Sequence, residues 1–409
     1  MTSELIAAAG AVHDDVVALR RAIHREPELD LDLPRTQGRV LDALAGLPLT
    51  VRTGDRLSSI VADLDGERPG PTVLLRADMD ALPMPEDTGL DYASTVPGVM
   101  HACGHDAHTA MLVGAARVLA ERRGELAGRV RFFFQPGEEG KGGAELALRE
   151  GLLDATDGGE AVSYAFAVHQ SPSYRRHTVA TKGGPLMASV NDFRVTLRGK
   201  GGHASMPHHA VDPVPVAAEV VLALQSLVTR RIDVFEPAVV TVTQFHAGTA
   251  NNVIPEVVTL GGTIRTVSPA TRETVTDGVR RVVTRVATAH DCEADVRITV
   301  GYPVTVNHAG PAADALDLAR AIGDERAAVT MPAPVMGAED FSYILDAVPG
   351  AMAFLGTRPE GVSAAHAAPN HSNRMVLNED ALVTGVALYA GTALRRLAPD
   401  DSGPSSANP

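Results

Sequence analysis

The chain has 409 residues and a formal net charge of −14 at pH 7; hydrophobic residues make up 45% of it and charged residues 21%. This composition is ordinary for a globular protein, and the length exceeds that at which one hydrophobic core usually stops growing, so two domains are expected. The excess of acidic residues argues against nucleic acid or an anionic membrane as a partner. No apolar run reads as a membrane span, the N-terminus lacks the basic region of a secretory signal, and there are two cysteines, Cys103 and Cys292. We therefore expect a cytoplasmic protein without a disulfide.

Residues 3–25 carry apolar positions at helical spacing and predict an opening amphipathic helix. From residue 59 onward, short runs rich in β-branched residues alternate with helical stretches such as 107–123. This alternation is typical of an α/β fold with a mostly parallel sheet. We assign residues 1–186 and 306–397 to this domain. In such sheets ligands bind beyond the carboxyl ends of the strands, so the site is expected there.

The pattern changes between residues 187 and 305. A strand at 193–197, a helix at 213–230, strands at 239–245 and 257–266, a helix opened by Ser268 and Pro269, and a strand at 296–304 follow in turn. The order β-α-β-β-α-β is that of a ferredoxin-like split unit, so residues 187–305 are predicted to form an inserted α+β domain. Residues 398–409 are rich in proline, serine and aspartate and are predicted to be a disordered tail.

The densest group of possible metal ligands is the run HACGHDAH, which begins at His101. One cysteine and several histidines in so short a run supply the donors that zinc and similar ions prefer, and Gly104 allows a turn that brings neighbouring side chains together. Taken alone, Cys103 and His105 could equally be a buried cysteine and a core histidine.

Adjacent carboxylates form a second group. Glu138 and Glu139 follow the apolar run RVRFFF closely, so they are expected where a buried strand ends. Unpaired charge is costly there, which indicates a metal or proton-transfer role; the alternative is a solvated loop. Asp80 follows a similar strand and could coordinate a metal or orient an imidazole that does. His169 and His371 are isolated, and alone each is more typical of a structural histidine.

Nine motifs resemble, in order, those of the metal-dependent aminoacylase and glutamate carboxypeptidase family, and most closely its branch of hippurate hydrolases and auxin-conjugate (IAA-amino acid) amidohydrolases. They are RRAIHREPEL, LLRADMDALP, MHACGHDAHTAMLVGAA, FFFQPGEEGKGGA, GKGGHAS, TANNVIPE, GGTIRT, MGAEDFSYIL and NHSNRMVLNEDAL. Because they keep one order along nearly the whole chain, chance does not explain them.

The resemblance implies a hydrolase of linear amide bonds that acts on N-acyl amino acids such as N-acetyl or N-benzoyl conjugates. It implies two divalent ions, zinc, manganese, cobalt or nickel, held by five side chains: Cys103, His105, Glu139, His169 and His371. The Cys103 thiolate would be shared between the ions. Glu138 would be the catalytic base, which takes a proton from the attacking water and returns it to the departing amine.

The same resemblance implies roles for five more residues. Asp80 would orient a metal ligand, Glu339 would lie near the metals, and Asn251 and Arg265 would lie near the free carboxylate of the substrate. His203 of the inserted domain would reach into a partner's site and stabilise the oxyanion, which implies a homodimer through that domain. Without the resemblance, Arg265 reads as a strand-surface charge.

The chain departs from this branch around the site. Gln170 follows His169 where valine is usual, Lys141 stands in place of a glycine, and Asn373 follows the motif of His371 where proline is usual. These departures bear on substrate preference and local packing more than on catalysis.

Three other functions fit parts of the pattern. A dipeptidase or carboxypeptidase on the same scaffold would need the same metals and carboxylate anchor. A binding protein that had lost turnover would have no reason to keep both glutamates, and a structural zinc site closes with four ligands, fewer than the five implied here. The roles of Cys292 and His246 stay open.

Overall fold

The chain forms two compact units in the computed structural model, which describes residues 2–156, 158–323 and 325–399. Unit 1 comprises Met1–Gly184, Val306–Pro332 and Tyr343–Pro409, and unit 2 comprises Pro185–Thr305 and Ala333–Ser342. The division differs from the sequence-based boundaries mainly at Ala333–Ser342, which we had placed with the first domain. Of the predicted tail, 398–409, all but the first two residues lie outside the described residues.

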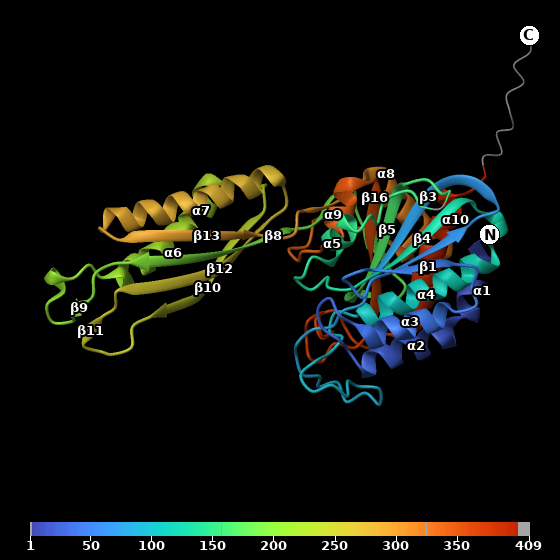
Figure 1. Cartoon of the computed structure of the whole chain (residues 1–409), viewed down its shortest axis with the longest axis horizontal. Helices are drawn as coiled ribbons and strands as arrows, with labels where there is room; N and C mark the ends of the chain where they lie inside the picture. The colour runs from blue at the N-terminus through green and yellow to red at the C-terminus, as the bar shows by residue number, and fades with distance from the viewer. Residues whose placement is uncertain (1, 157, 324, 400–409) are drawn as a thin grey trace, which may run out of the picture. The chain divides into compact units, whose positions relative to one another are not determined.

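An eight-stranded sheet with the order β1-β2-β4-β3-β5-β16-β6-β15 forms the centre of unit 1 (Figure 1). β3 runs parallel to both β4 and β5, β5 to β16, and β6 to β15. β1 and β2, β2 and β4, and β16 and β6 are antiparallel pairs. The predicted mostly parallel α/β sheet is thus confirmed. Its strands are β1 (Thr50–Thr53), β2 (Ile60–Asp65), β3 (Arg68–Asp78), β4 (Ala127–Gln135), β5 (Val162–Arg175), β6 (Val179–Thr181), β15 (Ala328–Thr330) and β16 (Gly350–Arg358).

Helices pack against this sheet and against one another. α4 lies against β3 and β4, with α2, α3 and α10 around it, and α8 and α10 lie against β16 and β5. Because α4 is enclosed in this way, almost all of its side chains are buried, which explains its apolar sequence. The helices are α1 (Thr2–Ala11), α2 (His13–Arg25), α3 (Pro34–Leu44), α4 (His105–Glu121), α5 (Gly143–Arg149), α8 (Ala309–Ile322), α9 (Ser342–Ala347) and α10 (Leu382–Arg396), with short 3-10 turns η1 (Arg123–Glu125), η3 (Glu325–Ala327) and η4 (Glu379–Ala381).

The predicted opening helix is in fact two helices, α1 and α2, that break at Val12. Gly10 lies just before the break and weakens the helix there. Asp14 and Asp15 lie in the first turn of α2, where negative charge favours a new helix start.

The carboxyl ends of β3 and β4 lie side by side, because Asp78 is the register partner of Gln135. The chain segments that leave these two ends carry Asp80 and Glu138. Beyond the last β3–β5 register pair, the buried hydroxyl of Tyr389 donates to the carbonyl of Arg76 at 2.7 Å and accepts the N–H of Val168 at 3.1 Å. This side chain satisfies backbone groups where the two strands part.

Unit 2 contains a four-stranded antiparallel sheet with the order β10-β12-β8-β13, and α6 and α7 pack on it (Figure 1). Along the chain the order is β8-α6-β10-β12-α7-β13, the ferredoxin-like order. The elements are β8 (Ser189–Arg198), β9 (Gly202–His203), η2 (Pro207–His209), α6 (Pro213–Arg231), β10 (Ala238–Ala247), β11 (Val253–Ile254), β12 (Val257–Thr266), α7 (Pro269–Ala289) and β13 (Glu293–Val300). β7 (Gly184–Met187) and β14 (Thr305–Asn307) form a separate two-stranded sheet.

α6 is, in the described part of the chain, the one helix long and apolar enough to cross a membrane by length and composition. The expectation that no apolar run reaches this length therefore does not hold for α6. However, Val216, Val220 and Leu224 pack into the core of unit 2. The apolar sequence of α6 is thus explained by its place in that core.

Candidate metal centre

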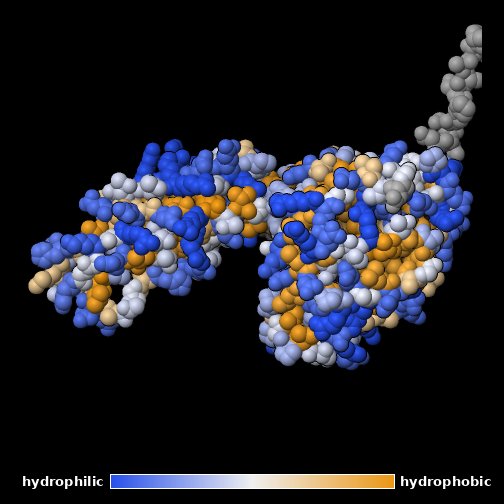
Figure 2. All heavy atoms as spheres, in the orientation of Figure 1, coloured by the Kyte–Doolittle hydropathy of each residue, from blue (hydrophilic) through white to orange (hydrophobic). Residues whose placement is uncertain are grey.

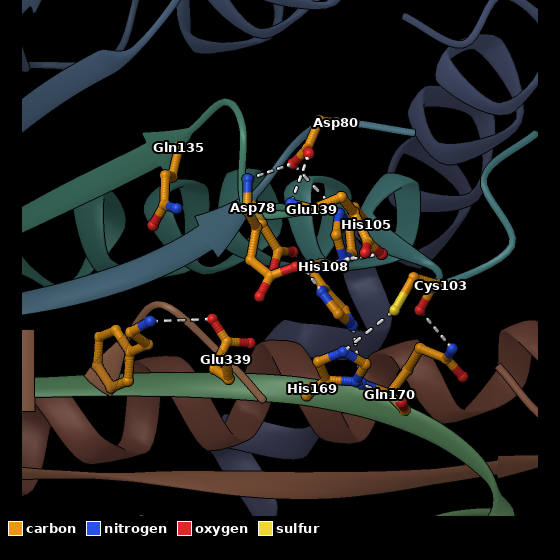
Figure 3. A network of polar contacts seen from close by, with 12 residues as sticks. Asp78, Asp80, Cys103, His105, His108, Gln135, Glu139, His169, Gln170 and Glu339 are labelled. Carbon is orange, nitrogen blue, oxygen red and sulfur yellow. Dashed lines mark hydrogen bonds and ion pairs between the residues drawn. The ribbon is translucent and has the colours of Figure 1, made fainter. Parts of the chain in front are cut away.

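Side chains able to bind a metal gather beyond the carboxyl ends of the unit 1 strands (Figure 3). Glu139 follows β4, His169 lies in β5, Cys103 and His105 stand at the start of α4, and His371 lies in the segment between β16 and η4. The structure therefore brings together all five residues that the resemblance had pointed to as ligands.

Cys103, His105 and His169 form one group, whose sulfur and nitrogen atoms lie within 4.8 Å of one another. Sγ of Cys103 is 3.4 Å from Nε2 of His169. Nδ1 of His169 donates to the backbone carbonyl of Gln170 at 2.7 Å, so the lone pair of the imidazole lies on Nε2, toward the sulfur. Burial lowers the pKa of His169, which keeps this ring neutral, as a metal ligand must be.

Cys103 also belongs to a second group, with Glu139 and His371. Nε2 of His371 lies 3.2 Å from Oε1 of Glu139. Hydrogen bonds to the Cys103 sulfur and to Glu139 raise the pKa of His371 to about 10, which reflects the negative charge gathered here. The His371 side chain is 55% exposed, so this group faces solvent, whereas the first group is buried.

Asp80 holds the turn that carries both glutamates. Its Oδ1 accepts the backbone N–H of Glu138 at 3.0 Å, and its Oδ2 accepts the backbone N–H of Glu139 at 2.9 Å. Asp80 is only 1% exposed, and hydrogen bonds to a carboxylate are stronger than those between neutral groups. The two bonds fix the Glu138 and Glu139 backbone, and both carboxylates lie in one group with His105.

His105 tests whether these residues fit a metal. Its ring is buried, and neither ring nitrogen makes a hydrogen bond within the described residues. The nearest carboxylate oxygens are those of Asp80 at 3.5 Å and Asp78 at 3.7 Å, with Glu139 at 3.9 Å. Buried polar atoms rarely lack a partner, so an unpartnered imidazole among carboxylates fits a bound cation. The thiolate, imidazole and carboxylate donors present suit zinc and neighbouring divalent metals.

The model of the Peptidase family M20/M25/M40 matches residues 74–395 of this chain. The chain belongs to this family. It is 37% identical over 388 residues to thermostable carboxypeptidase 1 of Saccharolobus solfataricus, with 94% of this chain and 96% of that protein covered. It is 37% identical over 390 residues to IAA-amino acid hydrolase ILR1-like 2 of Arabidopsis thaliana, with 94% and 86% covered. Among solved structures it is similar to the Bacillus subtilis YXEP protein, a dinuclear metal binding peptidase of the M20 family, with a TM-score of 0.81, 32% identity, and 95% and 99% of the chains covered.

Membership of the M20 family and the geometry of the site agree. The protein is a metal-binding hydrolase that acts on amide bonds. The resemblance read from the nine motifs is confirmed.

The run that begins at His101 supplies this M20 site with two candidate ligands, Cys103 and His105. His108 lies near Asp78 and His105, but protein groups occupy both of its ring nitrogens: Nδ1 pairs with Asp78 Oδ1 at 2.6 Å, and Nε2 accepts the N–H of Gln170 at 2.8 Å. Burial lowers the pKa of His101 to about 3, so His101 is a neutral ring in the interior.

Asp106 of the same run belongs to a buried charge network instead. Its Oδ2 accepts from Arg20 at 2.7 Å and pairs with Nδ1 of His24 at 2.8 Å. The network joins α2 to the first turn of α4 behind His105. The sequence offered no sign of this pairing, because the partners are more than eighty positions apart.

The remaining predicted site residues lie in unit 2. Nδ1 of the exposed His203 accepts hydrogen bonds from the hydroxyl and the N–H of Ser205, at 2.8 and 3.2 Å. Asn251 is exposed in the loop before β11. Arg265, in β12, donates to Thr263 and makes no ion pair within the described residues. Glu339 accepts the N–H of Phe341 at 3.0 Å.

Two of the three departures from the family pattern, Gln170 and Lys141, have a structural reading. Gln170 donates hydrogen bonds to the backbone carbonyl of Cys103 and to the side chain of Asn370, the residue before His371. Sequence reasoning did not place Gln170 or Asn370 in the site. The one available signal was that Gln170 replaces a valine. Lys141 forms a surface ion pair with Asp30 at 3.2 Å, away from the ligand atoms.

We predict that Asp80→Asn lowers kcat/KM about 10- to 100-fold, as loss of an outer group that orients a metal site does. The amide keeps the size of the side chain, but it offers one acceptor oxygen for two N–H groups and no charge. Steady-state kinetics with added metal measures the effect. Asp87→Asn, an exposed residue paired with Arg374, serves as the control. Full activity of Asp80→Asn would show that the two hydrogen bonds do not position the glutamates.

Proposed function

We propose that this protein is an amidohydrolase that cleaves N-acyl amino acids, such as N-acetyl or N-benzoyl conjugates, into an amino acid and a carboxylic acid. The observation that carries the proposal is Glu138. This residue is 5% exposed, its carboxylate lies in one group with His105 and Glu139, and its backbone N–H is held by Asp80. Such a carboxylate, beside a metal site and outside the five candidate ligands, suits proton transfer.

Two divalent ions, zinc, manganese, cobalt or nickel, would be held by the two groups that share Cys103. When bound, such ions polarise the amide carbonyl and make water a better nucleophile. Cys103, His105 and His169 would hold one side of the site, and Glu139 and His371 the other. The YXEP protein, described as a dinuclear metal binding peptidase, supports the number two.

Glu138 would carry the proton through the reaction. As its carboxylate takes a proton from the water that attacks the amide carbon, a C–O bond forms. The same carboxyl group then gives that proton to the amide nitrogen as the C–N bond breaks, so that the amine departs neutral. Asp80 would keep Glu138 in place throughout without touching the substrate.

Two unit 2 residues would recognise the substrate's free carboxylate, namely Arg265 and Asn251. Arg265 is half-buried and has no ion-pair partner in the described residues, so its planar guanidinium can bind two carboxylate oxygens. Such an anchor would favour substrates with a free α-carboxylate.

His203 would donate to the oxyanion of the reaction in a partner subunit. Ser205 supports this role, because its backbone N–H can only donate. Nδ1 of His203 must therefore accept, and the proton of the neutral ring lies on Nε2. Nε2 is then free to donate a hydrogen bond to a developing negative charge.

A homodimer through unit 2 is part of the proposal. β10 is an edge strand whose Val239 and Phe245 are exposed, and Leu222 of α6 and Phe235 after it are also exposed. Hydrophobic residues are visible among the hydrophilic ones on the surface of unit 2 in Figure 2. An open edge strand with apolar side chains invites pairing with another chain, and clustered exposed apolar groups mark interfaces.

We propose a cytoplasmic location because neither cysteine forms a disulfide. Cys103 and Cys292 are both buried and free, and Cys103 would serve as a thiolate, which a reducing compartment preserves. Cell fractionation tests this placement.

The alternative is a dipeptidase or carboxypeptidase on the same site, which the carboxypeptidase relative from Saccharolobus favours. Both functions use the same metals and carboxylate anchor, but they differ in the group on the other side of the amide. A dipeptidase must accept a free amino group, whereas an N-acyl amino acid brings none.

We expect amino acid release from N-acetyl, N-benzoyl or indoleacetyl amino acids by the metal-loaded protein, and loss of at least about 100-fold in Glu138→Ala because proton transfer is removed. The chelated protein should also be inactive. Glu145→Ala, an exposed glutamate of α5, is the control. Release from dipeptides alone would favour the alternative, and a fully active Glu138→Ala would remove Glu138 as the base.

Arg265→Gln should raise KM for an N-acyl amino acid about 10- to 100-fold, since a charge-assisted pair is lost. The same substrate with its α-carboxylate converted to a carboxamide should be equally poor for wild type and variant. Arg194→Gln on the neighbouring strand β8 is the control. If Arg265→Gln weakened both substrates equally, Arg265 would not bind the carboxylate.

Sedimentation of the wild-type chain of 42.7 kDa should give the mass of a dimer. The double variant Leu222→Glu and Phe245→Lys should give a monomer, because charge on an apolar interface opposes pairing. Val300→Lys on β13, the opposite edge strand of the same sheet, should stay dimeric. A monomeric wild type, or a dimer that only Val300→Lys breaks, would contradict the proposed interface.

A further inference from the structure

Gln170 contacts three of the segments that carry candidate metal ligands. Its backbone carbonyl accepts from Nδ1 of His169 at 2.7 Å, and its side-chain Nε2 donates to the backbone carbonyl of Cys103 at 2.7 Å. The same Nε2 donates to Oδ1 of Asn370, the residue before His371, at 2.9 Å. The side chain is fully buried.

Asn370 continues this network to the sulfur. Its Nδ2 donates to the backbone carbonyl of Gln170 at 3.3 Å and lies 4.0 Å from Sγ of Cys103, within reach of a weak N–H···S contact. Because Oδ1 of Asn370 is taken by Gln170, the orientation of the amide is set: its N–H side, and not its oxygen, faces the sulfur.

Two further contacts lock Gln170 itself. Its Oε1 accepts the hydroxyl of Thr357 at 2.7 Å, which leaves the amide one orientation. Gly104 has a φ of +87°, and a Cβ built on it would lie 2.6 Å from the Gln170 amide, so the side chain occupies the space beside a glycine. A valine at position 170, as is usual in the branch that the chain resembles, could make none of these side-chain hydrogen bonds.

We propose that Gln170 and Asn370 form a positioning pair that sets the places of the Cys103 sulfur, the His169 imidazole and the His371 backbone before a metal binds. The inference rests on the ligand roles in the proposed function, and it adds the pair that holds those ligands together. The two side chains act as one unit: Gln170 orients Asn370, and Asn370 presents an N–H to the sulfur. Neither residue touches the reacting atoms, so neither is catalytic.

Cobalt(II) is the probe, because its absorption spectrum reports both binding and the thiolate bond. Asn370→Leu and Gln170→Leu remove the amide groups at similar volume. Asn373→Leu is the matched control, since it makes the same substitution in the same segment at a side chain outside the Gln170 network. Chelator competition gives the cobalt dissociation constant, and the near-ultraviolet thiolate band gives the state of the sulfur.

We expect Asn370→Leu and Gln170→Leu to weaken cobalt binding about 10- to 100-fold, as loss of outer partners of metal ligands does. The thiolate band should shift in both, and Asn373→Leu should match wild type. Should Gln170→Leu fail to fold, Asn370→Leu decides alone, because that side chain is only half-buried.

Wild-type cobalt affinity and an unchanged band in Asn370→Leu would overturn the inference, as would an equal loss in Asn373→Leu. A wild type that binds cobalt without a thiolate band would overturn it too, together with the role of Cys103 as a ligand. Cobalt binding that follows the expected order without turnover of any N-acyl amino acid would refute the proposed function and support the positioning pair.

Discussion

The site depends on one contact: the buried carboxylate of Asp80 accepts hydrogen bonds from two neighbouring backbone N–H groups. Adjacent glutamates repel each other, and a turn that carried them without an anchor would move them into solvent. Asp80 follows β3 and the glutamates follow β4, so the two hydrogen bonds also tie the ends of neighbouring parallel strands. The same bonds therefore serve the fold and the placement of Glu138.

Buried ion pairs behind the ligands support this arrangement. Arg76 pairs with Asp78 at 2.8 Å, and Asp78 in turn pairs with His108, which accepts the backbone N–H of Gln170 in β5. Arg76 and the histidines hold the pKa of Asp78 well below its usual range despite its burial. Ion pairs and hydrogen bonds thus connect Arg76, Asp78 and His108 to the strand that carries His169. Because each of these three buried side chains has a partner, the cost of burying it is reduced.

Sequence reasoning found the parallel strands, because apolar runs are local features. The five candidate ligands came from the family resemblance, since His169 and His371 are isolated in the sequence and by themselves are more typical of structural histidines. Sequence reasoning did not find that Asp106 pairs with Arg20, or that both nitrogens of His108 are occupied, because those outcomes depend on which distant segment packs nearby. It took one helix where there are two, since periodicity continues across the weak point at Gly10. Gln170 was visible only as a departure, and its contacts follow from the packing of β5 against the start of α4.

The two ligand groups differ in exposure and in the kind of backbone that carries them. Cys103, His105 and His169 are buried and anchored by a helix start and a strand, whereas the His371 side chain is 55% exposed, in a segment without regular structure, with a left-handed φ of +65°. Such a backbone conformation costs energy unless its surroundings hold it, and here the N–H of His371 donates to the carbonyl of Ala102 at 2.9 Å. Regular structure thus holds the buried group in place, while His371 of the second group can be reached from solvent. It follows that the position of His371 depends on the contacts that tie its segment to the segment of Cys103.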